Sequence, residues 1–252
     1  MISEDEPGGI LALILAQHLA RPGSGLLLDL DGTLVDSEHV HRQAYRNYFA
    51  ARGWSVGDEA VLAFSGRRAP EVFATLDGPW AGEDPDELTE GVLDALRRTT
   101  LVPRPVPGAA ETLAACARTR LPVAVVTSAR LEWALPALEM LGARAELTHH
   151  AGRRVVGRGR AVALVTAEDC VHGKPDPEPY LRGAEVLGLD PARLLAAEDA
   201  PAGIASALAA GLGHVLGVTT THPGATLTAA GARSTAEDLR PLARALDPAG
   251  SR

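Results

Sequence analysis

Short runs of apolar residues alternate with amphipathic stretches over most of the chain. The apolar runs predict buried strands at residues 26–28, 123–126, 162–166, 194–197 and 215–218. The stretches between the later runs have the spacing of helices, which we expect over residues 109–118, 131–141, 177–187 and 203–210. Strands that alternate with helices predict an α/β fold, here a doubly wound parallel sheet with a Rossmann-like core.

The stretch from residue 37 to residue 104 departs from this alternation. Its pattern is helical, with helices expected over residues 38–51, 58–63, 69–76 and 85–99. A segment with alternating prolines follows over residues 102–108, which suits a stiff, extended connector. We therefore predict an inserted α-helical cap domain at 37–104 and a core domain built from 25–36 and 105–252.

Two further segments lie outside this scheme. Residues 1–24 carry an apolar run at 10–16, which is too short to span a bilayer and which follows acidic residues, unlike a signal peptide. We expect an accessory helix there, packed on the core. Residues 142–160 form a long, basic insert, for which we expect a surface or contact loop on the far side of the sheet.

Composition narrows the classes of function. The 252 residues are 46% hydrophobic, so the chain can bury a full core, and the formal net charge of −8 disfavours a general binder of nucleic acid or anionic membranes. Cys116 and Cys170 are the only cysteines and indicate reduced thiols in a cytoplasmic protein. We expect a monomer or weak homodimer with no nucleic-acid partner and no membrane partner.

Acidic side chains follow two of the predicted strands. The run at 26–28 stops at Asp29 and Asp31, and Glu198 and Asp199 follow the run at 194–197. Because parallel strands end at the same edge of a sheet, where α/β folds bind ligands, these acids are expected to lie together. Carboxylates that close raise one another's pKa unless a cation lies between them, and hard oxygen ligands suit Mg²⁺. A D-x-D pair alone would also fit a solvated turn, and Asp199 alone would fit a helix cap.

Two other polar side chains follow strands. Thr127 ends the run at 123–126, where a hydroxyl and the next N–H groups can bind a phosphoryl oxygen, although a simple helix cap is the alternative. Lys174 stands between Gly173 and Pro175, which fix the backbone. A positioned cation stabilises the charge that develops during phosphoryl transfer, whereas a lone lysine is ordinarily a solvated surface charge.

Taken together, these motifs resemble the haloacid dehalogenase superfamily, in its sugar-phosphatase and β-phosphoglucomutase-like branch. The resemblance rests on L-L-L-D-L-D-G-T-L-V-D-S, on the strand end at Thr127, on H-G-K-P-D-P-E-P-Y and on A-E-D-A-P-A-G-I, and it covers about residues 25–224.

The resemblance implies a role for each motif residue. Asp29 would be the nucleophile and Asp31 the general acid/base. Thr127, Ser128 and Arg130 would lie beside the substrate phosphate, and Lys174 would steady the nucleophile and the phosphoryl group. The implied cofactor is Mg²⁺, held by Asp29, the Asp31 main-chain carbonyl and Asp199, with Glu198 supporting the network. The presence of Asp31 and Asp199 argues against the dehalogenase branch.

Substrate choice is expected to reside in the predicted cap. Arg67 and Arg68 stand in a glycine-containing turn and could reach phosphate or sugar oxygens, with Arg68 favoured to face the site; a solvated turn is an equal alternative. His41 could assist cap closure or relay a proton, as the resemblance implies, but an interface histidine on an amphipathic helix is just as ordinary.

The sequence therefore predicts a Mg²⁺-dependent phosphatase. It would hydrolyse a small phosphorylated metabolite, a sugar or polyol phosphomonoester, through an aspartyl-phosphate. A β-phosphoglucomutase-like isomerase, which returns the phosphoryl group to the sugar, is the alternative enzyme. A catalytically silent binding protein on the same scaffold is the alternative from a different class, and the intact set of polar motif residues disfavours it.

Overall fold

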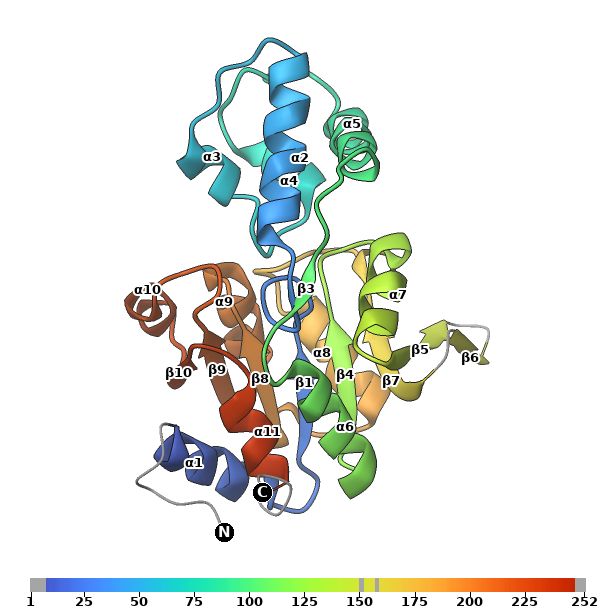
Figure 1. Ribbon diagram of the computed structural model, residues 1–252, viewed down its shortest axis with the longest axis vertical. Coiled ribbons are helices and arrows are strands. Elements are labelled where there is room, and N and C mark those ends of the chain that lie inside the picture. The colour runs from blue at the N-terminus through green and yellow to red at the C-terminus, as the bar shows by residue number, and fades with distance from the viewer. Residues whose placement is uncertain (1–7, 150–151, 157–158, 248–252) are drawn as a thin grey trace.

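The computed structural model describes residues 8–149, 152–156 and 159–247. Its main sheet has the strand order β10-β9-β8-β1-β4-β7-β5-β6, and every neighbouring pair is parallel except β5 with β6 (Figure 1). The strands are β1 (Gly25–Leu28), β4 (Val123–Val126), β5 (Ala143–His149), β6 (Gly152–Val156), β7 (Arg160–Val165), β8 (Leu194–Glu198), β9 (His214–Val218) and β10 (Ser234–Ala236). The predicted α/β fold with a doubly wound sheet is confirmed.

Helices cover both faces of this sheet. One face carries α1 (Gly9–Leu19), α6 (Ala109–Thr119), α7 (Leu131–Met140) and α11 (Arg240–Leu246). The other carries α8 (Glu178–Leu187), α9 (Pro201–Ala209) and α10 (Gly224–Ala229), and the short helices η1 (Ala167–Asp169) and η2 (Pro191–Arg193) lie in connections. Successive side chains of β1 lie on opposite faces of the sheet: Leu26 and Leu28 belong to one apolar core, and Leu27 belongs to the other. Burial on both faces explains why this strand is apolar throughout.

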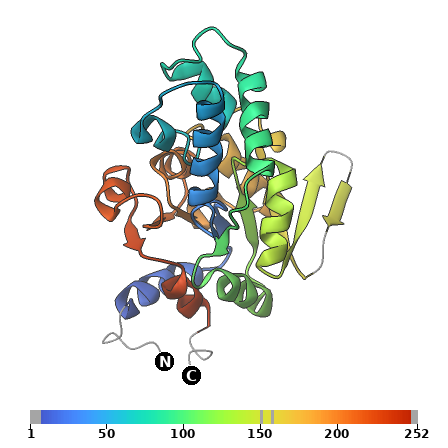
Figure 2. The ribbon, with the colours of Figure 1, turned by 45° about the horizontal axis from the view of Figure 1, so that its top comes forward.

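A helical insertion, defined here as residues 38–97, lies beyond the carboxyl ends of the strands (Figures 1 and 2). It contains α2 (Glu38–Ala51), α3 (Asp58–Leu62), α4 (Ala69–Thr75) and α5 (Pro85–Arg97). Its own apolar core is mostly aromatic and includes Phe49, Phe64, Phe73 and Trp80. An antiparallel ribbon of β2 (Val35–Asp36) and β3 (Arg104–Pro105) joins it to the sheet. The assignment of three domains with the boundaries given above stays a prediction.

The prediction of a loop over residues 142–160 is wrong. This segment forms β5 and β6, which extend the main sheet at the edge beside α7 (Figure 2). The physical reason is visible at its start, where buried Ala143 and Ala145 alternate with exposed Arg144 and partly buried Glu146. Period-two alternation is the pattern of a half-buried strand, and β5 pairs with β7 in parallel register. Residues 150–151 and 157–158 lie outside the described residues.

The expected N-terminal helix is present as α1, which contacts α11. Ala12, Leu15 and Leu19 are buried in the same apolar core as Leu242 of α11. Within the described ranges, we find no helix that combines the length and the hydropathy needed to cross a bilayer.

Two buried histidines join α1 to the start of β9. His18 lies on α1, and its Nε2 donates a hydrogen bond to the Arg193 carbonyl at 3.2 Å. Its ring centroid lies 5.8 Å from that of His214. His214 contacts the Ser234 hydroxyl at 2.9 Å. Burial, the neighbouring His18 and Arg233 lower the pKa of His214 to about 4. Burial also lowers the pKa of His18, with smaller contributions from Arg21 and Arg233.

These depressed pKa values predict a loss of stability in mild acid. Because the folded pKa of His214 lies below the ordinary value of 6.5, the unfolded chain binds the proton first as pH falls. The contribution of His214 to the free energy of unfolding, taken as the difference between the wild type and His214→Gln, should therefore change little above about pH 7 and should become less favourable by about 1–2 kcal/mol between about pH 6.5 and 4, a value reduced from the full linkage limit for solvent screening. Urea unfolding across this pH range measures it. The His214→Gln variant should show a flatter profile, and an equally steep one would contradict the assignment.

Candidate active site

The carboxyl ends of three adjacent strands position the polar residues of the site. β1 lies between β8 and β4, so Asp29, Thr127 and the Glu198–Asp199 pair emerge at neighbouring strand ends. This is the point at which the strand order reverses, where open α/β sheets bind ligands. Gly32 makes the turn after β1 possible: its φ is +84°, and a Cβ there would lie 1.9 Å from an Asp199 carboxylate oxygen.

Lys174 lies at the centre of this arrangement. Its ammonium donates to Asp29 Oδ1 and to Glu198 Oε1, both at 2.6 Å, and to the Val126 carbonyl at 3.0 Å. These three bonds use all its donors, and the residue is fully buried. Burial by itself would lower the pKa of Lys174, but the two carboxylates raise it, so the side chain stays charged. The predicted contact between Lys174 and Asp29 is therefore present.

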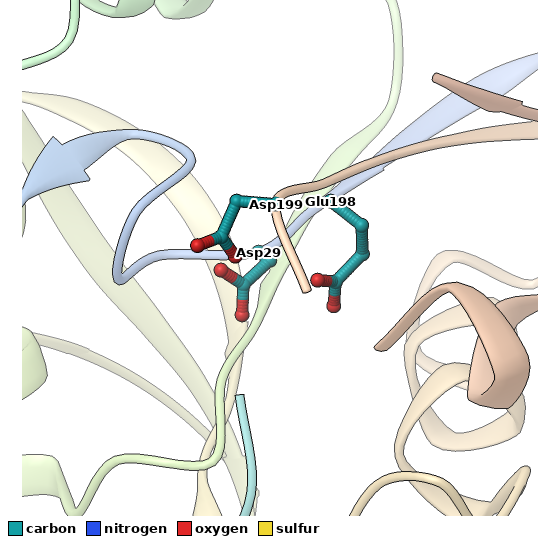
Figure 3. Close-up of side chains that lie close together, drawn as sticks. All are labelled: Asp29, Glu198 and Asp199. Atoms are coloured by element: carbon teal, nitrogen blue, oxygen red, sulfur yellow. The ribbon is translucent and has the colours of Figure 1, made fainter. Parts of the chain in front are cut away.

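Three buried carboxylates meet beside Lys174 (Figure 3). Asp29, Glu198 and Asp199 each offer an oxygen, and these atoms lie within 4.8 Å of one another. Glu198 Oε1 is already bonded to Lys174 and to the Tyr180 hydroxyl at 2.7 Å. By contrast, Asp29 Oδ2 and Asp199 Oδ1 are buried and have no hydrogen-bond partner among the described residues. Unpaired carboxylate oxygens in this setting are suitable ligands for a hard divalent cation such as Mg²⁺.

The pKa values of these acids also indicate that the cluster lacks positive charge. Burial and the neighbouring Glu198 raise the pKa of Asp29 to about 7, against the opposing effect of Lys174. Burial, Asp29 and Glu198 likewise raise the pKa of Asp199. One ammonium thus does not balance three carboxylates, and a divalent cation between Asp29 and Asp199 would favour their charged forms.

Asp31 lies apart from this cluster. Its Oδ1 accepts from the Ser37 hydroxyl at 2.6 Å, from the Trp133 indole N–H at 2.8 Å and from His41 Nε2 at 3.1 Å. Burial would raise the pKa of Asp31, but His41 and these hydrogen bonds lower it. Burial would likewise lower the pKa of His41, yet Asp31 and Glu38 raise it. Two carboxylates that are two residues apart therefore have separate surroundings, and the role of the Asp31 main-chain carbonyl as a metal ligand stays a prediction.

The residues after β4 divide between the core and the insertion. Thr127 is buried, and its hydroxyl accepts from the Ala129 N–H at 3.0 Å. This local hydrogen bond is of the kind expected for a simple helix cap. Ser128 donates to the Gly66 carbonyl at 3.1 Å, and Arg130 forms an ion pair with Glu90 of α5. Thr127, Ser128 and Arg130 all line the same cavity of about 440 Å³ as Asp29 and Asp31. Ser128 and Arg130 thus contact the insertion in this structure, and their contact with a phosphate stays a prediction.

Arg67 and Arg68 both line this cavity, but their guanidinium groups differ. Arg68 donates to the carbonyls of Ala167 at 2.7 Å, Cys170 at 2.9 Å and Val171 at 3.1 Å, all in the connection after β7. Arg67 has no hydrogen-bond or ion-pair partner among the described residues, and its Nε is buried. Arg68 thus holds the insertion on the core, and the role of either arginine in substrate binding stays a prediction.

Three residues with clear contacts in the site were not singled out from the sequence. Tyr180 belongs to the H-G-K-P-D-P-E-P-Y stretch that also holds Lys174, and its place in that motif was the available signal. Glu71 of α4 accepts from the Gly173 N–H at 2.7 Å, directly before Lys174. Trp133 of α7 reaches Asp31 across 102 residues of sequence. Neither Glu71 nor Trp133 stands in a recognisable motif, because both act through tertiary contacts.

The fold and the site together place a buried carboxylate beside a buried lysine at the carboxyl edge of an α/β sheet. A family model for the haloacid dehalogenase-like hydrolases matches residues 24–211. The chain belongs to this family, which confirms the resemblance.

Two sequence relatives and one solved structure agree with this family assignment. The chain is 37% identical over 206 residues to validoxylamine A 7'-phosphate phosphatase from Streptomyces hygroscopicus subsp. limoneus, covering 81% of this chain and 89% of that protein. It is 35% identical over 197 residues to hexitol phosphatase A from Escherichia coli (strain K12), covering 77% and 82%. A crystal structure of a hydrolase from Pseudomonas syringae has the same fold, with a TM-score of 0.73, 24% identity and coverage of 90% and 99%. Both named relatives are phosphatases, and this chain is an enzyme of the same hydrolase family.

Proposed function

We propose that this enzyme hydrolyses a small sugar or polyol phosphomonoester through an aspartyl-phosphate on Asp29. The observation that carries the proposal is the separate environment of the two carboxylates that follow β1. Both line the cavity, but Asp29 has Lys174 on one oxygen, whereas Asp31 has its own set of donors. Such a pair suits one nucleophile and one proton-transfer group.

In the proposed first step, an Asp29 carboxylate oxygen attacks phosphorus and the bond from phosphorus to the leaving oxygen breaks. The negative charge of the bound phosphate favours the protonated form of Asp31, which gives a proton to that oxygen, and the oxygen leaves as the alcohol. In the second step Asp31 takes a proton from water as the water attacks phosphorus, which releases inorganic phosphate and restores Asp29. Lys174 stays charged throughout and stabilises the negative charge that gathers near Asp29.

Mg²⁺ is the proposed cofactor, held by Asp29, the Asp31 main-chain carbonyl and Asp199. The two unpaired oxygens on Asp29 and Asp199 support this assignment. When bound, the ion supplies positive charge beside the phosphoryl oxygens. Glu198 is proposed to act indirectly, because one of its oxygens bridges Lys174 and Tyr180.

A phosphate-release screen over hexitol, hexose, pentose and triose phosphates tests the function. We expect release of inorganic phosphate from sugar or polyol phosphates, with the similarity to hexitol phosphatase A as the reason to begin with hexitol esters. Appearance of an isomeric sugar phosphate without free phosphate would instead support the mutase alternative. No conversion of any ester in the presence of Mg²⁺ would contradict both.

The two arginines of the insertion are expected to give different phenotypes. Arg67→Ala should lower kcat/KM about ten- to a hundredfold and change the ranking of substrates, because a guanidinium on an oxyanion contributes about 1.5–3 kcal/mol. Arg68→Ala should instead loosen the insertion from the core, seen as faster proteolysis between β2 and β3. Arg68→Lys should not restore it, since one ammonium cannot reach three carbonyls in a fork.

Both arginine variants should still bind beryllium fluoride as an aspartyl-phosphate mimic, because that reaction needs only groups of the core. A wild-type ranking of substrates in Arg67→Ala would show that this side chain is a solvated turn residue.

A further inference from the structure

Trp133 contacts the proposed acid/base group from the core side of the cavity. It lies in the first turn of α7, and its indole N–H donates to Asp31 Oδ1 at 2.8 Å. The ring is held on two sides: it packs against the apolar core that contains Leu28 and Val125, and it meets the His41 ring edge-on with centroids 4.6 Å apart. A side chain fixed in this way can hold its acceptor in one orientation.

The three donors to Asp31 all bind the same oxygen. Ser37, His41 and Trp133 bond to Oδ1, whereas Oδ2 has no hydrogen-bond partner among the described residues. A carboxylate oxygen that already accepts three hydrogen bonds has no lone pair left for a proton, so a proton must bind the other oxygen. Oδ2 is therefore the atom that can exchange a proton with a ligand in the cavity.

Trp133 differs from the other two donors in where it is anchored. His41 belongs to α2 of the helical insertion and Ser37 immediately precedes that helix, whereas Trp133 belongs to α7 of the core. Any displacement of the insertion would move His41, but it would leave the indole in place. Trp133 is thus the donor that keeps Asp31 aligned independently of the insertion.

We propose that Trp133 is a positioning residue that holds Oδ1 of Asp31 and thereby directs Oδ2 toward the leaving oxygen of the substrate. The proposal rests on the phosphatase function proposed above. In the first step the proton on Oδ2 passes to the leaving oxygen as its bond to phosphorus breaks, and in the second step Oδ2 takes a proton from the attacking water. The indole N–H stays bonded to Oδ1 in both steps.

The test compares leaving groups in the Trp133→Phe variant. Phenylalanine keeps the ring packing but lacks the N–H. An alkyl phosphate such as a hexitol phosphate needs a proton on its leaving oxygen, whereas p-nitrophenyl phosphate does not, because p-nitrophenolate is a stable anion. Since kcat/KM reports formation of the aspartyl-phosphate, we expect it to fall about tenfold for the alkyl ester. For the aryl ester it should stay within about twofold.

Trp80→Phe is the matched control. Trp80 is another buried tryptophan whose indole N–H donates to a carbonyl, that of Leu76 at 3.0 Å, but it lies in the core of the insertion, away from Asp31. Its ratio of alkyl to aryl kcat/KM should equal that of the wild type. Equal losses on both esters in Trp133→Phe would overturn the proposal and show that the indole serves only packing.

A spectroscopic readout separates this proposal from the proposed function. The chain has three tryptophans, and the indole ¹⁵N–H signal of Trp133 is the one that Trp133→Phe removes. In Asp31→Asn that signal should shift strongly, since its acceptor loses its charge, while the signals of Trp54 and Trp80 stay in place. An unmoved Trp133 signal would overturn the contact even in an active phosphatase. A wild-type enzyme that cleaves neither ester would contradict the phosphatase function but not the contact.

Discussion

The Asp29→Asn variant is expected to keep its fold and to lose essentially all turnover. An amide cannot form the aspartyl-phosphate, so the loss should exceed a hundredfold on every substrate. The fold should survive because the amide oxygen can still accept the Lys174 hydrogen bond, and because Asp29, with a pKa near 7, is already close to neutral before a cation binds. Phosphate release and thermal unfolding measure the two effects.

Asp36→Asn is the control for this variant. Asp36 lies in β2, and its side chain is 53% exposed. Among the described residues, the only ion-pair partner of its carboxylate is His39, at 3.6 Å. Its activity should equal that of the wild type. If Asp29→Asn retains more than about one hundredth of wild-type activity, covalent catalysis by this residue is ruled out.

Removal of divalent cations is expected to abolish turnover, and Mg²⁺ should restore it. Ca²⁺ should inhibit, because its larger and looser coordination displaces the oxygens that must be aligned for transfer. Binding should also be visible without turnover: each tenfold rise in Mg²⁺ above its dissociation constant should add about 1.4 kcal/mol to the free energy of unfolding. Titration of chelated enzyme with Mg²⁺, followed by activity and by thermal unfolding, measures both.

The Asp199→Asn variant tests where the ion binds. Asp199 Oδ1 is one of the buried carboxylate oxygens without a hydrogen-bond partner among the described residues, so its loss should weaken the Mg²⁺-dependent stabilisation. Full activity in excess chelator would remove the metal from the mechanism, and an undiminished thermal shift in Asp199→Asn would place the ion elsewhere.

Much of the site could be predicted from the sequence because its residues follow strands. Apolar runs locate the strand ends, and parallel strands bring those ends together whatever the distance along the chain. Asp29, Glu198 and Lys174 are therefore joined in space as expected, although 145 residues separate Lys174 from Asp29. The strand assignment missed β5 and β6 in the basic segment, where the pattern is obscured, and the short strands β2, β3 and β10, which carry no apolar run.

The rest of the site could not be predicted because it depends on how the insertion and the core meet. Nothing in the sequence distinguishes Arg67, which is free, from Arg68, which binds three carbonyls. The sequence offered His41 as a proton relay or as an interface residue, and the structure shows it on Asp31. The sequence does not indicate a role for Trp133 in the site, because a tryptophan on an amphipathic helix normally indicates core packing.

The ribbon of β2 and β3 limits how the insertion can move. Both crossings of the chain between insertion and core run through it, and the pairing of Val35 with Pro105 and of Asp36 with Arg104 ties them side by side. A rotation about one crossing would break these main-chain contacts, whereas a bend of the whole ribbon would keep them. Opening and closing should therefore follow a single path, and one distance between a label on α5 and a label on α6 would report the whole motion.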